Sequence, residues 1–192
     1  MINSENFNKA FYYAAENEGE CSNHPMDKGG YTRCGVSLQL LKTMFKNGTF
    51  WLDKNGDGII DQSDSDKLST VDIKKVYYDE FWARIRSVPI DALRIKLFDA
   101  AVNVGVGRAI KMLQRSIDVI DDGIIGPKTI QKIKDIGLAK ISVLFTNELE
   151  KFYIWQTFKD KSQQVFLKGW LRRANKWPDS AHEISELAKK AI

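Results

Sequence analysis

The sequence predicts a mainly α-helical fold with one small β element. Apolar residues recur at helical spacing through most of the 192 residues. Strand signals are short and fall within residues 20–36, where turn-forming residues also gather. No stretch rich in proline, serine or glycine separates the two halves of the chain, so we expect a single globule rather than domains on a flexible linker.

Nine segments carry the helical pattern: residues 4–17, 38–47, 70–85, 90–103, 107–117, 127–135, 138–160, 163–175 and 180–191. Ser37 is placed to cap the second segment. Ser69 and Asp72 have the spacing of a capping box at the start of the third segment. Pro127 suits the first position of a helix that follows a glycine-containing turn.

The composition excludes several functional classes. A net charge of +4 is modest for a nucleic-acid-binding protein, and no basic run with interleaved aromatic residues is present. The first 20 residues lack the basic and apolar regions of a secretory signal, and no apolar stretch is long enough to span a membrane. We therefore expect a protein that is made in the cytoplasm and has no stable membrane insertion. A monomer is the default expectation for its oligomeric state.

Glu18 is the first candidate for catalysis. Counting about 100° per residue from Phe7, three apolar residues share one face of the first helix: Ala10, Phe11 and Ala14. Glu18 projects into the middle of that face. A carboxyl turned toward a core is partly desolvated, which raises its pKa and lets it donate a proton near neutral pH. The alternative is that Glu18 only caps or salt-bridges the helix end.

Asp27 and Thr32 are the second and third candidates. The turn-rich segment after Gly19 is expected to fold back as a loop or small hairpin, which would bring both residues near Glu18. Glycosidic cleavage needs a neutral carboxyl to protonate the bridging oxygen and a second polar group, usually an ionised carboxylate. Asp27 would act as the base and Thr32 would position the water. The alternative is that Asp27 only closes a turn.

The stretch from Glu18 to Val36, EGECSNHPMDKGGYTRCGV, resembles the signature of glycoside hydrolase family 108. The matching positions are Glu18, Gly19, Asn23, Pro25, Asp27, Gly29, Gly30, Thr32, Gly35 and Val36. The Glu, Asp, Thr spacing is also similar to that of phage-type lysozymes. The resemblance implies a lysozyme-like fold and peptidoglycan hydrolysis with Glu18 as the acid. Three departures bear on the shape of the cleft: Glu20, Cys21 and Lys28 stand where the family has Gly, Tyr and Pro.

The second half of the chain resembles the C-terminal region found with these hydrolases, often called a peptidoglycan-binding domain. The resemblance is carried by residues 98–115, 122–129 and 169–177. It implies a catalytic lobe over residues 1–90 and a helical lobe over residues 91–192. Asn103, Gln114 and Trp170 are candidates to line a sugar groove, in which Trp170 would offer a stacking face. The alternative for Trp170 is a packed position in the core.

Residues 53–64, DKNGDGIIDQSD, have the pattern of an EF-hand calcium loop. The expected ligands of a single structural Ca²⁺ are Asp53, Asn55, Asp57, the Ile59 carbonyl, Asp61 and Asp64. Gly58 would permit the sharp bend, and Asp64 has a shorter reach than the usual Glu. The exit segment over residues 62–70, QSDSDKLST, reads as a poor helix, which suggests half an EF-hand. The alternative is an acidic turn that binds no ion.

The resemblance implies a phage endolysin, an N-acetylmuramidase that hydrolyses the β-1,4 bond between N-acetylmuramic acid and N-acetylglucosamine. Such an enzyme needs no cofactor for catalysis and would reach the periplasmic cell wall after a holin permeabilises the membrane. Three alternatives stay open: a lytic transglycosylase, a non-catalytic calcium-dependent wall-binding protein and an intracellular calcium-binding protein. Cys21 and Cys34 flank the loop, and we expect free thiols in a cytoplasmically folded protein, with a disulfide as the alternative.

Overall fold

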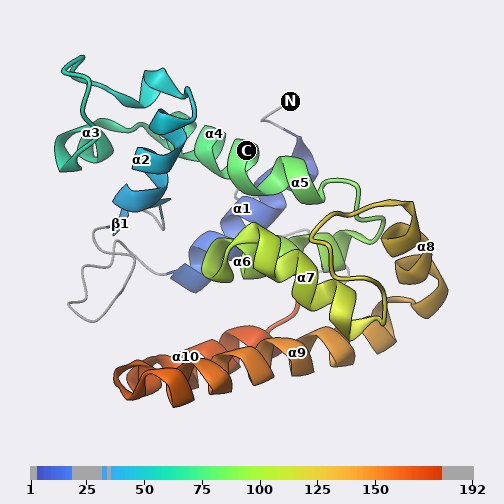
Figure 1. The fold of residues 1–192 in the computed structure, drawn as a ribbon. Coiled ribbons are helices and arrows are strands. Elements are labelled where there is room, and N and C mark those ends of the chain that lie inside the picture. Colours follow the sequence, from blue (N-terminus) through green and yellow to red (C-terminus); the bar gives the residue numbers. More distant parts are fainter. Residues whose placement is uncertain (1–3, 19–31, 34–35, 179–192) are drawn as a thin grey trace.

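The computed structural model describes residues 4–18, 32–33 and 36–178, which fold as packed helices with one pair of short strands (Figure 1). The elements are α1 (Glu5–Glu18), β1 (Thr32–Arg33), β2 (Val36–Ser37), α2 (Leu38–Lys46), α3 (Gln62–Lys67), α4 (Thr70–Tyr77), α5 (Ala83–Ile85), α6 (Asp91–Val104), α7 (Val106–Ser116), α8 (Pro127–Ile136), α9 (Leu138–Lys159) and α10 (Gln164–Asn175). Short 3₁₀ turns cover Phe50–Leu52 and Lys161–Gln163. The predicted mainly α fold with a small β element is confirmed.

The ends of several helices follow the capping signals in the sequence. The Ser37 hydroxyl accepts a hydrogen bond from the Leu40 N–H at 3.2 Å, and Ser69 and Asp72 form the expected capping box. Pro127 occupies the first turn of α8. The segment predicted as one helix over residues 70–85 contains a five-residue π-helical stretch, Tyr78–Trp82, between α4 and α5. The helix expected over residues 180–191 lies outside the described residues.

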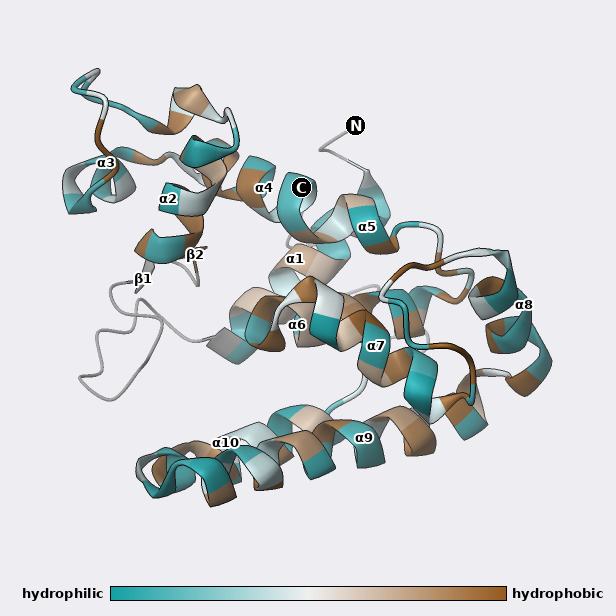
Figure 2. Ribbon diagram, in the orientation of Figure 1, coloured by the Kyte–Doolittle hydropathy of each residue, from teal (hydrophilic) through white to brown (hydrophobic). Residues whose placement is uncertain are grey.

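α6 is the central helix of the fold. Its side chains are buried on every face, including those of Lys96 and Asp99, as expected for a helix enclosed by others. α1 packs along it, and α7, α9 and the π-helical stretch also contact it. Figure 2 shows hydrophobic residues recurring along α6, α7 and α9. α6 therefore joins the N-terminal and C-terminal parts of the chain.

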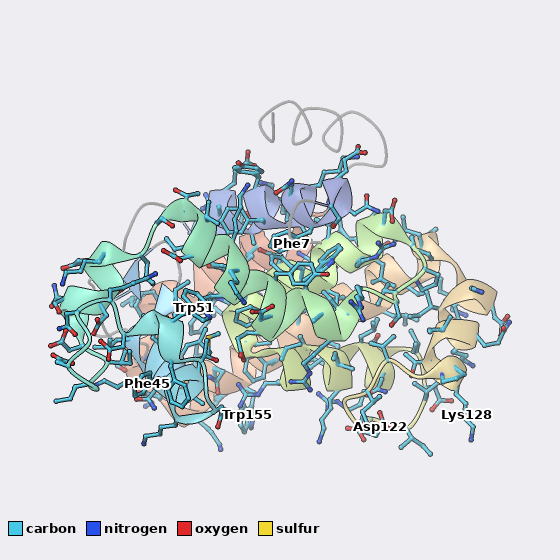
Figure 3. All side chains as sticks on the ribbon, turned by 90° about the horizontal axis from the view of Figure 1, so that it is seen from above. Phe7, Phe45, Trp51, Asp122, Lys128 and Trp155 are labelled. Atoms are coloured by element: carbon cyan, nitrogen blue, oxygen red, sulfur yellow. The ribbon has the colours of Figure 1, made fainter. Side chains whose placement is uncertain are left out.

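An aromatic cluster fixes the first half of α1 against this central helix. The Phe7 ring meets Tyr78, Trp82 and Phe98 edge-on, at centroid distances of 5.2, 5.8 and 6.1 Å. Figure 3 shows Phe7 beneath α1, facing the neighbouring helices. Aromatic pairs of this kind each add about 0.5–1.5 kcal/mol beyond the burial of their area. The N-terminal half of α1 is thus held by apolar packing.

α9 and α10 fold back on each other through the turn at Lys161–Gln163, and α7 and α8 pack against α9. One cluster of buried apolar side chains extends from Phe7 to Ala174, so the core is continuous across the lobe boundary that we expected at residues 90 and 91. No helix in the described part of the chain has both the length and the apolar character needed to cross a membrane.

Candidate active site

Glu18 occupies the last position of α1. The predicted apolar stripe of this helix is confirmed, because Phe7, Ala10, Phe11 and Ala14 are at most 8% exposed. Helical spacing places position 18 one turn beyond Ala14 on the same face. The backbone position of the candidate acid is therefore at the C-terminal end of the buried stripe. The side chain of Glu18 lies outside the described residues.

The β element follows the turn-rich segment. β1 and β2 pair in antiparallel fashion, with Thr32 opposite Ser37 and Arg33 opposite Val36. Val36 is 1% exposed, so β2 is fixed to the core at the start of α2. The backbone of Thr32 is thus held on a short strand pair. Its side chain lies outside the described residues, as does the whole loop over residues 19–31 with Asp27 and Cys21, and likewise Cys34.

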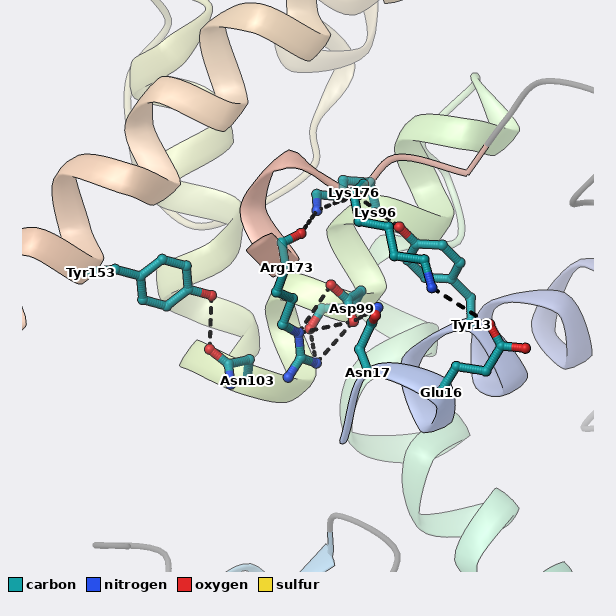
Figure 4. A network of polar contacts seen from close by, with 9 residues as sticks. All are labelled: Tyr13, Glu16, Asn17, Lys96, Asp99, Asn103, Tyr153, Arg173 and Lys176. Atoms are coloured by element: carbon teal, nitrogen blue, oxygen red, sulfur yellow. Dashed lines mark hydrogen bonds and ion pairs between the residues drawn. The ribbon is translucent and has the colours of Figure 1, made fainter. Parts of the chain in front are cut away.

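A buried ion pair lies beside the end of α1. The Arg173 Nη2 donates to Asp99 Oδ1 at 2.9 Å, and the Arg173 Nε lies 3.1 and 3.2 Å from the two carboxylate oxygens. Asp99 is 1% exposed and Arg173 is 9% exposed. Asp99 Oδ1 also accepts from the Asn17 amide at 3.0 Å (Figure 4). The carboxylate therefore links α1, α6 and α10.

Further contacts tie the chain just after α10 to the same place. Lys96, which is fully buried on α6, donates from Nζ to the carbonyls of Arg173 and Lys176 at 2.5 and 2.6 Å. The Tyr13 hydroxyl donates to the same Lys176 carbonyl at 2.8 Å. Burial removes water from the Lys96 ammonium and lowers its pKa from 10.5 to about 8. A titratable amine thus holds the end of α10.

A cavity of about 620 Å³ opens at the end of α1. Its walls include Glu16 and Asn17 from α1, Asn103 from α6, and Trp170 and Arg172 from α10. This volume lies within the usual range of about 300–1,000 Å³ for small-molecule sites. Since residue 18 directly follows Asn17, the cavity begins beside the backbone position of the candidate acid.

The structure brings together two of the three candidate sugar contacts. Asn103 and Trp170 line this cavity and also a neighbouring one of about 190 Å³. Trp170 is half-buried and stacks on Tyr153, with 5.3 Å between centroids and 23° between planes. The Tyr153 hydroxyl donates to Asn103 Oδ1 at 2.8 Å (Figure 4). Trp170 therefore packs on a core residue and also lines the two cavities.

Gln114, the third candidate, lies apart from the other two beneath the turn that precedes α8. It is 1% exposed, and its Nε2 donates to the Asp122 carboxylate, the Ile124 carbonyl and the Thr129 hydroxyl. Its Oε1 accepts from the Gly123 N–H at 2.8 Å. The hydrogen bond from Gln114 also lowers the pKa of Asp122. In this arrangement the Gln114 amide is used to hold the turn.

The 53–64 loop is organised by hydrogen bonds from its own backbone. Asp53 accepts from the N–H groups of Gly58 and Gly56 at 2.8 and 2.6 Å, which lowers its pKa. Asp64 is fully buried and accepts from Lys54 and Asp61 N–H groups at 2.7 and 3.0 Å. These bonds turn the carboxylates toward the loop backbone.

The expectation of a poor helix after this loop is corrected by the structure, which has the six-residue α3 there. Asp61 and Asp64 form a capping box at its start, which pairs backbone N–H groups that have no partner within the helix. Within the described ranges, no three His, Cys, Asp or Glu side chains are grouped so that they could hold a metal ion. A Ca²⁺ ion would require the loop to draw its carboxylates together, so calcium binding stays a prediction.

Lys96, Asp99 and Arg173 were not identified from the sequence as parts of a site. A signal for two of them exists, because Lys96 and Asp99 lie three residues apart among the apolar residues of α6 and must find partners when buried. Arg173 carries no such local signal. Its partner is 74 residues away in the sequence.

Comparison with known proteins identifies two regions of the chain. Residues 11–105 match the family model described as glycosyl hydrolase 108, and residues 108–175 match one described as "Predicted Peptidoglycan domain". The fold is similar to that in "Structure of Brucella abortus SagA", with a TM-score of 0.67 and 24% identity over 96% of this chain and 92% of that chain. Among curated proteins, no sequence match was found.

The two matched regions meet at the junction of α6 and α7, whereas the lobe boundary expected from the sequence lay before α6. Asn17 and Asp99 fall in the first region, and Trp170 and Arg173 fall in the second. The cavity at the end of α1 therefore has walls from both regions. By these matches, residues 11–105 are similar to a glycosyl hydrolase 108 domain and residues 108–175 to a predicted peptidoglycan domain.

Proposed function

We propose that this protein is an N-acetylmuramidase, which hydrolyses the β-1,4 bond between N-acetylmuramic acid and N-acetylglucosamine in peptidoglycan. The observation that carries this proposal is the position of Glu18. It ends the buried stripe of α1, next to a cavity lined by both domains, in a region that matches a glycoside hydrolase family. The peptidoglycan domain favours the cell-wall polymer as the substrate.

Glu18 acts in this proposal as the general acid that protonates the bridging oxygen. Asp27 acts as the base and Thr32 positions the attacking water. The distance between the two carboxyl groups sets the stereochemical outcome. A separation of about 6.5–9.5 Å leaves room for a water molecule and gives inversion, and one of about 5–5.5 Å gives retention.

Asn103 and Trp170 are the proposed sugar contacts. Because Asn103 Oδ1 accepts from Tyr153, its Nδ2 group is oriented as a donor, and no described residue accepts from it. An amide donor of this kind suits the carbonyl of a sugar N-acetyl group. The Trp170 ring, held by its stack on Tyr153, supplies a rigid apolar face.

The biological role that we propose is that of a phage endolysin. In this role the protein is synthesised in the host cytoplasm, acts as a monomer, and reaches the periplasmic cell wall after a holin permeabilises the membrane. The net charge of +4 supports approach to the anionic wall polymer.

The test is the cleavage of purified sacculi by the wild type, by Glu18→Gln and by a control, Glu5→Gln. Glu5 lies at the other end of the same helix and is 72% exposed. We expect the wild type and the control to release fragments with reducing N-acetylmuramic acid ends, and Glu18→Gln to be at least about 100-fold slower, as is usual when a general acid is lost. Anhydro ends would identify a lytic transglycosylase instead. Cleavage by Glu18→Gln at the wild-type rate would exclude the proposed mechanism.

A further inference from the structure

Residues 173–176, at the end of α10, close over the last turn of α1, and we call them the α10 clamp. Lys176 of the clamp accepts a hydrogen bond from Tyr13 through its carbonyl, and its Nζ lies 3.6 Å from the Glu16 carboxylate. Asn17 is joined to the clamp through the buried carboxylate of α6 (Figure 4). The end of α1 is therefore held by polar contacts with α6 and with the end of α10.

Of these contacts, the one made by Asn17 is the best placed to fix the last residues of α1. The Glu16–Lys176 pair is 40% and 37% exposed, and exposed pairs contribute little. The acceptor of Asn17 is instead the fully enclosed Asp99, whose orientation is set by two guanidinium nitrogens of Arg173. Asn17 thus has a rigid partner one residue before Glu18.

Stability alone does not account for an ion pair at this place. Replacing a buried ion pair with apolar residues of similar volume is often neutral or stabilising. The pair of Asp99 and Arg173 supplies something that apolar side chains lack, namely an acceptor fixed in direction. The last turn of a helix has unpaired carbonyl groups and frays easily, so such an acceptor restrains the end of α1.

We propose that Arg173 is a positioning residue, which acts through Asp99 and Asn17 to fix the backbone at Glu18. The inference rests on the proposed function, since it assumes that Glu18 is the acid. A catalytic group misplaced by about 1 Å can cost about 100-fold in rate. Because Arg173 belongs to the predicted peptidoglycan domain, that domain takes part in catalysis as well as in binding.

The first test is the Asn17→Ala variant, which leaves the ion pair of Asp99 and Arg173 in place. Activity is measured on soluble, uncross-linked peptidoglycan, with Glu5→Gln as the control on the same helix. We expect kcat to fall at least about tenfold while KM stays within about twofold of the wild type and the melting temperature changes little. A raised KM with an unchanged kcat would mean that Asn17 only contacts substrate, and it would overturn the proposal.

The second test is a double-mutant cycle with Arg173→Lys, which keeps the charge but loses the two-nitrogen contact. If Arg173 acts through Asn17, Arg173→Lys lowers kcat in the wild type and causes no further loss in Asn17→Ala. Losses that multiply would contradict this route. If Arg173→Lys fails to fold, the result for Asn17→Ala decides the question alone.

The two proposals fail in different ways. If Glu18→Gln cleaves peptidoglycan normally, the proposed function is wrong. If Glu18→Gln is inactive while Asn17→Ala keeps the wild-type kcat, the muramidase proposal stands and the role of the α10 clamp is refuted.

Discussion

The buried amine of Lys96 gives the protein a specific pH dependence, which the Lys96→Met variant tests. Lys96 is fully buried, and its Nζ donates to two carbonyl groups in the α10 clamp. Below about pH 8 the folded protein therefore encloses an ammonium ion. Methionine has a similar length and removes both the charge and the donor.

The sign and size of the effect follow from the lowered pKa. The unfolded chain keeps the Lys96 proton up to about pH 10.5, whereas the folded protein releases it near pH 8. Between these values the unfolded state binds more protons, so the free energy of unfolding rises with pH. The difference between 10.5 and about 8 corresponds to about 3 kcal/mol at most, and this gain is complete above pH 10.5.

The assay is urea unfolding of the wild type and of Lys96→Met at several values between pH 7 and pH 10.5. Subtracting the two free energies of unfolding removes the contributions of tyrosines and other shared groups. We expect the stability of the wild type relative to the variant to grow by about 2–3 kcal/mol over this range. Near pH 7 the substitution removes two hydrogen bonds, which destabilises the variant, and also a buried charge, which stabilises it. The advantage of the wild type in free energy of unfolding is therefore smallest at this pH. A difference that stays constant with pH would show that the pKa of Lys96 is not lowered in the folded protein.

Three further predictions concern the other features of the chain. Trp170→Ala should raise the KM for soluble peptidoglycan about tenfold, which corresponds to about 1.4 kcal/mol, and Trp170→Phe should raise it less. An unchanged KM would contradict a role of Trp170 in binding. Gln114→Ala should lower the free energy of unfolding by about 1–3 kcal/mol in denaturant titrations, because the buried partners of Gln114 lose their hydrogen bonds. The KM should stay unaltered, and a raised KM would show that Gln114 contacts sugar. If the 53–64 loop binds calcium, Ca²⁺ at about 100 times its Kd should stabilise the protein by about 2.7 kcal/mol, and both EDTA and Asp53→Asn should reverse this shift in calorimetry. Equal melting temperatures with Ca²⁺ and with EDTA would rule the site out.

Local signals in the sequence were enough to predict most helices. Helix starts are marked by Ser37, by the capping box at Ser69 and by the proline at the start of α8. These signals act within a few residues, so periodicity and caps together locate the helices. The six-residue α3 was missed because weak helix formers masked a capping box. The π-helical stretch Tyr78–Trp82 was missed because it interrupts a helix without a change in periodicity.

The site could be predicted only in part, for a physical reason. The helical face of Glu18 follows from spacing alone, and it agrees with the buried stripe of α1. The contact between Asp99 and Arg173 depends on which helices pack together, and the local pattern of the sequence does not contain that information. For Gln114 the residue type is ambiguous. A side-chain amide can bind a sugar, but it can equally bond the backbone of a buried turn, as Gln114 does.

The catalytic role of Glu18 is tested by the kcat of Glu18→Gln relative to that of Glu5→Gln on soluble peptidoglycan, with both variants shown to be folded. Loss of the acid should lower kcat by about 100-fold or more, while substrate binding is retained. Equal kcat values for the two variants would contradict the claim that the end of α1 carries the catalytic acid.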